Sequence, residues 1–328
     1  CNVVHFSEFS PNPKVEDVKK ALVEFQAFQP RKIIAVGGGS ALDVAKLVRY
    51  FAATGIEPEE PASLPNGNSH HLIPLLAVPT TAGSGSEATH FAVIYKGFIK
   101  HSVAHPSLRP SHVWLNPRFT MSASPYQVAC SGFDAFAQGI ESLWAVGATE
   151  NSKLDSSKAI TLCLRHLEGA VLARSPQHCA GMLEAANLSG QAINVSKTTA
   201  AHAMSYALTA HYGLPHGHAV AMILPAVFEA NAAVTDRNVN DPRGAAFVHA
   251  ALRELCTRLG CTSVPMAVRR IRELMAGIGL SETWFSSHGF NLTTVRNFVT
   301  QEVNLDRLAN NPRRLDAEAF AQILAQIR

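Results

Sequence analysis

Apolar residues recur along the chain with two different spacings. In Val15–Phe28 they return every three to four residues, which predicts an amphipathic helix, and Ser40–Ala53 is a second predicted helix. Short apolar runs bounded by turn-forming residues predict strands. These runs are Lys32–Val36 and Leu72–Val78, which we expect to be buried, and Phe91–Tyr95 and His112–Leu115. Strands and helices in this order indicate a parallel sheet with crossover helices.

The character of the chain changes near Ser122. Long segments rich in Ala, Leu and Glu follow, interrupted by Gly and Pro, and they predict helices. The linker is expected in Asn116–Ser124, because Pro117 interrupts regular structure within that stretch and Pro125 directly follows it. We therefore expect an α/β domain over residues 1–118 and an all-α domain over residues 119–328.

Composition narrows the class of protein. Hydrophobic residues make up 47% of the 328 residues and charged residues 16%, so the chain can bury a large core and is not intrinsically disordered. Its net charge of +3 gives no electrostatic basis for binding nucleic acid or an anionic membrane. No apolar run reaches the ~20 residues of a membrane span.

The cysteines and the first residues of the chain indicate the cellular compartment of the protein. Six cysteines without a CxxC pair are typical of reduced thiols in a cytoplasmic protein. The chain begins at Cys1 rather than Met, and no signal-peptide pattern follows. We expect a cytoplasmic protein from which an N-terminal segment is missing.

A glycine-rich loop follows the first predicted strand. Gly37, Gly38, Gly39 and Ser40 lead into a helix that carries Asp43. Backbone N–H groups at a helix N-terminus bind phosphate, so the loop predicts a nucleotide site. It departs from the dinucleotide fingerprint GxGxxG, because a leucine stands at the third glycine position. The alternative is a glycine-rich turn without a ligand.

A second loop of small and hydroxyl residues, Pro79–Glu87, follows the strand Leu72–Val78. It contains Thr80, Thr81 and Ser84 and lies where parallel sheets bind ligands. Two such loops in one α/β domain favour a dinucleotide, although a polar loop without a ligand remains the alternative.

Polar residues in the predicted helix Phe133–Trp144 have the spacing of a metal site. Asp134 and Gln138 stand four residues apart, so their side chains share one face, and Glu141 follows about one turn later.

Two histidines further along the chain can complete that site. His202 lies in the predicted helix Thr198–Ala210, and a turn at Gly213–Pro215 would bring His216 back toward it. Two His, one carboxylate and one amide oxygen can hold a divalent metal and leave room for a substrate oxygen. The alternative is that the histidines only make hydrogen bonds.

The chain contains the segments GGGSALDVAK, PTTAGSGSEAT, SGFDAFAQGIESLW and HAMSYALTAHYGLPHGHAVA. Together they resemble the iron-containing (group III) alcohol dehydrogenase family, and the resemblance covers essentially the whole chain. Gln138 and the segments WAVGATENSK, SKTTAAHAMSYALT and GLPHGHAV look like one branch of that family, the phosphonoacetaldehyde reductases. The resemblance implies a dehydroquinate synthase-like fold, with a divalent metal, Fe(II) or Zn(II), in the cleft between an α/β domain and a helical domain.

The resemblance also implies which residues hold the metal. Its ligands would be Asp134, Gln138, His202 and His216, where position 138 is usually histidine in the family. A further histidine of the family pattern is replaced here by Tyr206, which puts its role in proton transfer in doubt.

The implied cofactor is NAD(P)H. Its phosphates would bind at the first loop and its adenosine region at the second, with Lys100 near the nicotinamide ribose. Ser7 stands where an aspartate is associated with NAD preference in the family, which favours NADPH. The cofactor residues are thus Ser7, Gly37, Gly38, Gly39, Ser40, Asp43, Thr80, Thr81, Ser84 and Lys100.

The implied reaction is hydride transfer between the cofactor and a small aldehyde, most specifically phosphonoacetaldehyde. His218, Tyr206 and His211 are the candidates for moving the proton, and His218 could instead support the nearby ligand. Lys197 is the candidate for binding an anionic substrate group, and its alternative is a solvated lysine at a helix start. The family implies a homodimer or a larger assembly.

Other functions are compatible with these patterns. A glycerol-type or general short-chain alcohol dehydrogenase would keep the fold and the reaction type. Dehydroquinate synthase shares the fold but consumes no reductant, so stoichiometric use of NAD(P)H separates the two. A nucleotide-binding paralogue without catalysis is a third reading, motivated by Gln138 and Tyr206.

Overall fold

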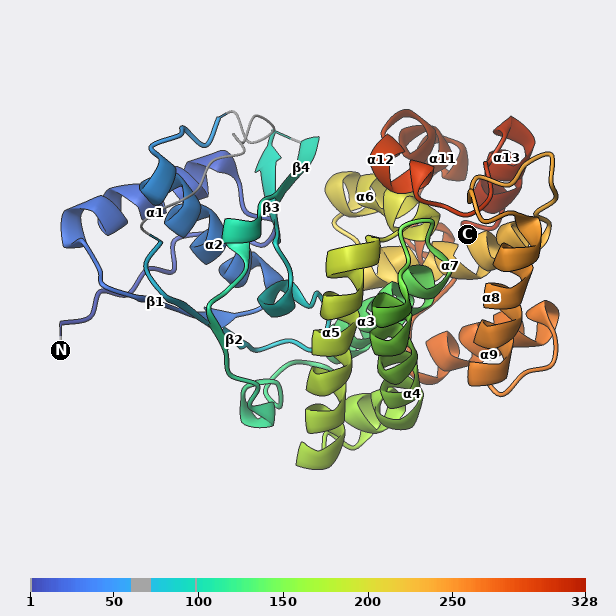
Figure 1. Cartoon of the computed structure of the whole chain (residues 1–328), viewed down its shortest axis with the longest axis horizontal. Helices are drawn as coiled ribbons and strands as arrows, with labels where there is room; N and C mark the ends of the chain where they lie inside the picture. The colour runs from blue at the N-terminus through green and yellow to red at the C-terminus, as the bar shows by residue number, and fades with distance from the viewer. Residues whose placement is uncertain (1, 60–71, 98) are drawn as a thin grey trace.

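The computed structural model describes residues 2–59, 72–97 and 99–328, and it consists of two parts (Figure 1). The part coloured blue to teal combines strands and helices, whereas the part from green to red is helical. The predicted fold class is therefore confirmed. The first part contains α1 (Val15–Phe28), β1 (Ile33–Gly37), α2 (Gly39–Thr54), β2 (Leu75–Pro79), β3 (Phe91–Lys96), β4 (Ile99–Ala104) and β5 (His112–Val113), with one-turn helices at Ser86–Ala88, Pro106–Leu108 and Pro117–Phe119.

The predicted parallel sheet is formed by β1, β2 and β5, in the order β1-β2-β5. Ile33 pairs with Leu75, and Leu76 pairs with His112. The first helix has the predicted bounds, and α2 extends one residue beyond the prediction at each end. Because β1 and β2 are parallel, the loops that follow them emerge at the same edge of the sheet.

The third predicted strand was placed wrongly. β3 does not join the parallel sheet but pairs antiparallel with β4, a strand that the sequence did not predict. Only two residues separate these strands, and Gly97 among them has a φ of +61°. Such a short connection can only reverse the chain into a hairpin. The predicted strand Leu72–Val78 also begins later, at Leu75, and the fourth predicted strand spans only His112–Val113.

The expectation that Lys32–Val36 is a buried strand is wrong for one face of β1. Ile34 and Val36 are 58% and 54% exposed, whereas Ala35 is buried. The reason is that only one face of β1 is covered, where Ala35 packs with Leu42 of α2 and with Leu75 of the neighbouring strand β2.

The helical part is organised around α3, which is buried along most of its length and packs against α4, α5 and α7. None of the described helices is both long enough and apolar enough to cross a membrane, and the five described cysteines form no disulfide. The helices are α3 (Pro125–Trp144), α4 (Glu150–Leu172), α5 (Pro176–Ser196), α6 (Ala200–Tyr212), α7 (His216–Ala232), α8 (Ala245–Arg258), α9 (Val264–Gly277), α10 (Trp284–Ser287), α11 (Leu292–Gln301), α12 (Leu305–Ala309) and α13 (Ala317–Ala325).

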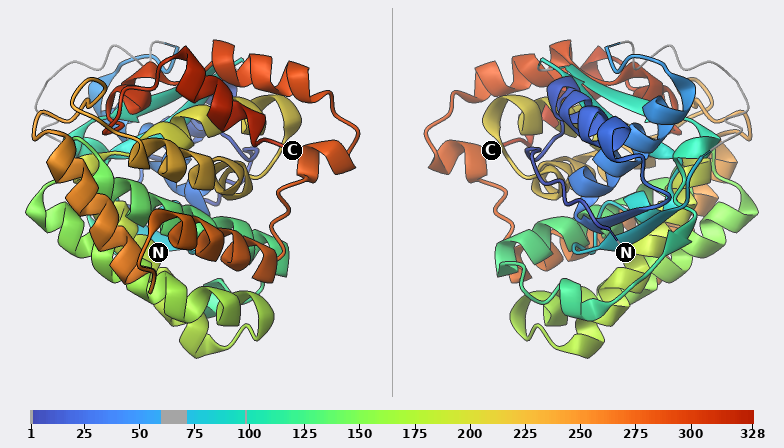
Figure 2. Two further views of the ribbon diagram at one scale, coloured as in Figure 1. Left: turned by 90° about the vertical axis from the view of Figure 1, so that its right-hand side faces the viewer. Right: turned by 90° about the vertical axis from the view of Figure 1, so that its left-hand side faces the viewer.

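The break between α6 and α7 is where the sequence predicts it. α6 ends at Gly213, whose φ of +66° an L side chain rarely adopts, and α7 begins at His216 directly after Pro215. The C-terminal helices, red in Figure 2, return to this region, and α12 packs against α6. Residues from the end of the chain thereby reach the space between the two parts.

Candidate active site

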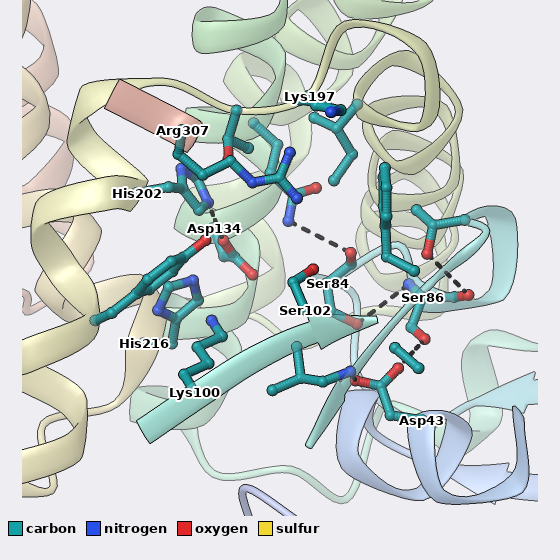
Figure 3. Close-up of a pocket in the computed structure, with 18 residues that line it drawn as sticks. Asp43, Ser84, Ser86, Lys100, Ser102, Asp134, Lys197, His202, His216 and Arg307 are labelled. Atoms are coloured by element: carbon teal, nitrogen blue, oxygen red, sulfur yellow. Dashed lines mark hydrogen bonds and ion pairs between the residues drawn. The ribbon is translucent and has the colours of Figure 1, made fainter. Parts of the chain in front are cut away.

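A cavity of about 140 Å³ lies where the strands β3 and β4 face the helices α3, α6 and α7 (Figure 3). Half of the candidate residues line it, although they come from distant segments of the chain. Those that line it are Asp43, Ser84, Lys100, Asp134, Gln138, Lys197, His202, Tyr206 and His216.

Three of these residues form a cluster with the chemistry of a metal site. Asp134 on α3, His202 on α6 and His216 on α7 each offer one ligand atom, and these atoms lie within 4.8 Å of one another. His202 Nε2 is 3.1 Å from Asp134 Oδ1. Two imidazoles and a carboxylate suit a first-row divalent metal such as Fe(II) or Zn(II), so the donor set fits the group that the family implies.

His216 reaches the cluster because α7 approaches α3 very closely. A Cβ added to Gly217 would lie 1.8 Å from the carbonyl oxygen of Cys130 and 3.2 Å from Asp134 Cβ. Only glycine leaves room for the backbone of α3 at this point. The turn through Gly213 and the bare Gly217 backbone thus set His216 beside Asp134.

Glu141 orients the second histidine. It is fully buried, and its Oε1 accepts hydrogen bonds from Thr199 N, Thr199 Oγ1 and Ala201 N at 2.7 to 3.1 Å. The other oxygen, Oε2, accepts from His202 Nδ1. With its proton held on Nδ1, His202 presents Nε2 to the cluster, which is the arrangement that metal-binding histidines use.

Charge differs between the two histidines. Burial by itself lowers the pKa of His202, but the carboxylates of Glu141 and Asp134 outweigh it and raise that pKa to about 10. For His216, burial and the Lys100 ammonium lower the pKa to about 3. His216 is therefore unprotonated at neutral pH and has a lone pair for a metal.

Gln138 lines the same cavity but is held by other groups. Its Oε1 accepts a hydrogen bond from Ser189 Oγ at 3.0 Å, and its Nε2 donates to Ser84 O at 3.4 Å. Because Ser84 O can only accept, the amide nitrogen must face it. The amide oxygen consequently points at α5 in this structure.

The three candidates for proton transfer occupy different places. Tyr206 lines the cavity, with its ring centroid 5.7 Å from that of His216 and 3.6 Å from Lys100 Nζ. His211 lies at the end of α6, where it pairs with Glu302 at 2.7 Å, outside the cavity lining.

His218 is also outside the lining and is 1% exposed. Its Nε2 lies 2.9 Å from Ser281 O, which can only accept, so the proton sits on Nε2. Nδ1 then accepts from the Tyr126 hydroxyl at 2.8 Å. Both ring nitrogens are occupied, and the ring braces α7 against α3 and the segment before α10.

The two predicted phosphate loops meet at the edge of the sheet. Thr80 N donates to Gly37 O at 2.9 Å, and a Cβ on Gly38 would lie 3.3 Å from Thr81 Oγ1. A Cβ on Gly39 would lie 2.9 Å from Ser84 Oγ.

The other predicted cofactor residues lie around these loops. Ser40 Oγ accepts from Asn12 N at 3.2 Å, whereas Ser7 is exposed. Asp43 is tied to the second loop, because its carboxylate accepts from Ser86 Oγ at 2.6 Å and from Val93 N at 2.9 Å. The buried Lys46 ammonium donates to Ser86 Oγ and Phe91 O, so Asp43 and Lys46 fix the shape of this loop.

Sequence reasoning noted Glu141 but gave it no role in this site, and it missed Arg307 altogether. Glu141 had a signal, because it stands seven residues after Asp134 on the same helix, two turns along the same face. Arg307 on α12 lines the cavity without any local signal, since its segment is far along the chain from every other lining residue.

Comparison with known proteins places this geometry in a family. Residues 1–117 match the family described as iron-containing alcohol dehydrogenase, and residues 128–328 match its C-terminal domain. The chain belongs to the iron-containing alcohol dehydrogenase family. It is an oxidoreductase of the alcohol dehydrogenase type, as the resemblance in the sequence implied.

Similar proteins indicate the range of substrates in the family. A phosphonoacetaldehyde reductase from Streptomyces viridochromogenes is 32% identical over 96% of this chain and 80% of its own. A 1-propanol dehydrogenase from Salmonella typhimurium is 32% identical over 70% of this chain and 59% of its own. A sulfoacetaldehyde reductase from Bifidobacterium kashiwanohense, solved in complex with NAD+, is 25% identical, with a TM-score of 0.83 over 98% of this chain and 82% of its own.

Proposed function

We propose that this protein reduces phosphonoacetaldehyde to 2-hydroxyethylphosphonate with NAD(P)H and a divalent metal. The observation that carries the proposal is a single cavity in which the Asp134–His202–His216 cluster lies beside several cationic side chains. Two of the similar proteins are named for aldehydes that carry a phosphonate or a sulfonate, which agrees with an anionic substrate.

Asp134, His202 and His216 would hold Fe(II) or Zn(II). When bound, such an ion supplies a Lewis acid for the substrate oxygen. Glu141 keeps His202 in the required tautomer, and Asp134 contributes the negative charge. The glycine loop 37–40 and the loop 80–86 would bind the dinucleotide phosphates through backbone N–H groups and hydroxyls. Preference for NADPH, a cytoplasmic location and a homodimer or larger assembly stay predictions.

When bound, the reduced nicotinamide would supply a hydride to the aldehyde carbon, so that the cofactor would be oxidised and the aldehyde reduced. The former carbonyl oxygen takes up one proton to give the alcohol. Of the three candidates for this proton, Tyr206 is the one that lines the cavity, and Lys100 lies over its ring. We therefore assign proton donation to Tyr206.

Replacing Tyr206 by phenylalanine is expected to lower kcat about 100-fold, because a positioned proton donor contributes ~10²–10⁴ to the rate. Steady-state rates with saturating cofactor measure this. Tyr50→Phe is the matched control, because the Tyr50 hydroxyl lies outside the cavity lining and has no hydrogen-bond partner among the described residues. A full rate in Tyr206→Phe together with a loss in His211→Gln would move the role to His211.

Replacing Gln138 by histidine is expected to tighten metal binding about tenfold, since a neutral amide oxygen is a poorer ligand than imidazole for these metals. Competition with a chelator of known affinity gives the dissociation constant for Zn(II) in both proteins. An unchanged constant and unchanged activity would contradict the idea that Gln138 weakens retention of the metal.

The substrate is tested by comparing oxidation of NADH and NADPH with phosphonoacetaldehyde, butanal and lactaldehyde. We expect kcat/KM to be highest for phosphonoacetaldehyde. A preference for the uncharged aldehydes would instead favour a general short-chain alcohol dehydrogenase, which the similarity to a 1-propanol dehydrogenase supports. That result would contradict phosphonoacetaldehyde as the substrate but not the assignment to the family.

A further inference from the structure

Three cations line the cavity from different parts of the fold: Lys100 on β4, Lys197 between α5 and α6, and Arg307 on α12. Within the described part of the chain, none of them lies within ion-pair distance of a carboxylate. The Lys100 ammonium lies over the Tyr206 ring, 3.6 Å from its centroid. The positive charges of Lys197 and Arg307 are therefore not neutralised by a carboxylate of the described residues.

Arg307 is held in place by its surroundings. The helix that carries it is capped by Asn304, whose Oδ1 accepts from Arg307 N at 2.9 Å. The guanidinium lies over the Phe91 ring, with 5.2 Å between Cζ and the centroid. This cation–π contact restrains the guanidinium at the cavity, and no carboxylate among the described residues forms an ion pair with it.

The same segment positions Lys197. Asn310 follows directly after α12, and its Nδ2 donates to the carbonyl oxygens on both sides of Lys197, Ser196 O at 2.8 Å and Thr198 O at 2.9 Å. These bonds hold Lys197 at a φ of +62°, a conformation that side chains rarely adopt. One hydrogen-bonded unit therefore sets both cations at one cavity.

We propose that Arg307 and Lys197 together bind the oxyanion group of the substrate, and that Arg307 sets the preference for anionic aldehydes. The inference rests on the proposed function and names the residue behind its substrate class. A tetrahedral phosphonate or sulfonate offers three oxygens, so it can accept two N–H bonds from the planar guanidinium and one from an ammonium. An uncharged aldehyde offers no such acceptor.

A phosphate of the dinucleotide is the other oxyanion that could bind here. Figure 3 shows Arg307 and Lys197 on the side of His202, whereas Asp43 and Ser86 of the loop region lie on the opposite side. That separation favours the substrate over the cofactor as the source of the oxyanion.

The test compares wild type with Arg307→Gln in the metal-loaded protein. We expect the KM for phosphonoacetaldehyde to rise about 10- to 100-fold, the range for loss of a charged hydrogen bond, with kcat changed less than about threefold. The KM values for butanal and for the cofactor should stay within about twofold. Inhibition by 2-hydroxyethylphosphonate, measured with butanal as substrate, should weaken in parallel. The KM of Arg307→Lys for phosphonoacetaldehyde should lie between those of wild type and Arg307→Gln. Arg270→Gln, at an exposed arginine outside the cavity, is the matched control.

Equal KM values for phosphonoacetaldehyde in Arg307→Gln and wild type would overturn the inference while leaving the proposed function intact. A rise in the KM for the cofactor with butanal would also overturn it, since the oxyanion would then belong to the dinucleotide. If wild type itself prefers butanal, the proposed function fails, and the inference fails with it.

Discussion

Replacing Gly217 by alanine is expected to abolish metal binding and to destabilise the protein by about 3 kcal/mol, as overpacking against a rigid backbone does. The added Cβ would overlap the carbonyl oxygen of Cys130 on α3, which belongs to a buried helix and cannot move alone. α7 would have to shift outward, and His216, its first residue, would leave Asp134 and His202.

Two measurements check this expectation: the Zn(II) stoichiometry of the purified protein and the free energy of unfolding without metal. Gly260→Ala is the matched control outside the cavity lining, because Gly260 has open space around its Cβ position and only its positive φ opposes a side chain. The control should lose about 1–2 kcal/mol and keep its metal. Metal binding by Gly217→Ala with wild-type affinity would show that His216 is not placed by this helix contact.

Replacing Glu141 by glutamine is expected to weaken metal binding about 10- to 100-fold without removing any ligand. With Oε1 kept as the acceptor from Thr199 and Ala201, the new amide NH₂ would face His202 Nδ1. An N–H cannot donate to another donor, so His202 would be left with its proton on Nε2, the nitrogen that would have to bind the metal.

A chelator competition with Zn(II) measures the affinity, and NMR of the histidine ring nitrogens reports the tautomer. Glu150→Gln serves as the control, since that carboxylate is exposed at the start of α4 and the change in net charge is the same. If Glu141→Gln bound Zn(II) as tightly as wild type, the orientation of His202 would not depend on this carboxylate.

The helices were predictable because their signals are local. The apolar spacing of Val15–Phe28 fixes one buried face, and Gly213 with Pro215 ends one helix and begins the next. The β3–β4 hairpin was not predicted, because strand pairing depends on partners outside the strand itself. The exposure of Ile34 has the same cause, since the pattern of a strand does not say whether both its faces are covered.

The site was predictable to the extent that its residues lie near a turn or share a helix face. Asp134 with Glu141, and His202 with His216, carry such spacing. The hydrogen bond between Gln138 and Ser189 could not be predicted, because it depends on how α5 packs beside α3. The place of Arg307 could not be predicted either, since the packing of α12 on α6 brings this residue to the cavity.

The most direct test of the central claim is the balance between cofactor consumed and alcohol formed, in metal-loaded and in chelator-treated protein. With phosphonoacetaldehyde, we expect one 2-hydroxyethylphosphonate for each NAD(P)H oxidised, loss of turnover on chelation, and recovery with Fe(II) or Zn(II). Product without cofactor oxidation, or undiminished turnover in metal-free protein, would contradict a metal-assisted hydride transfer at the Asp134–His202–His216 cluster.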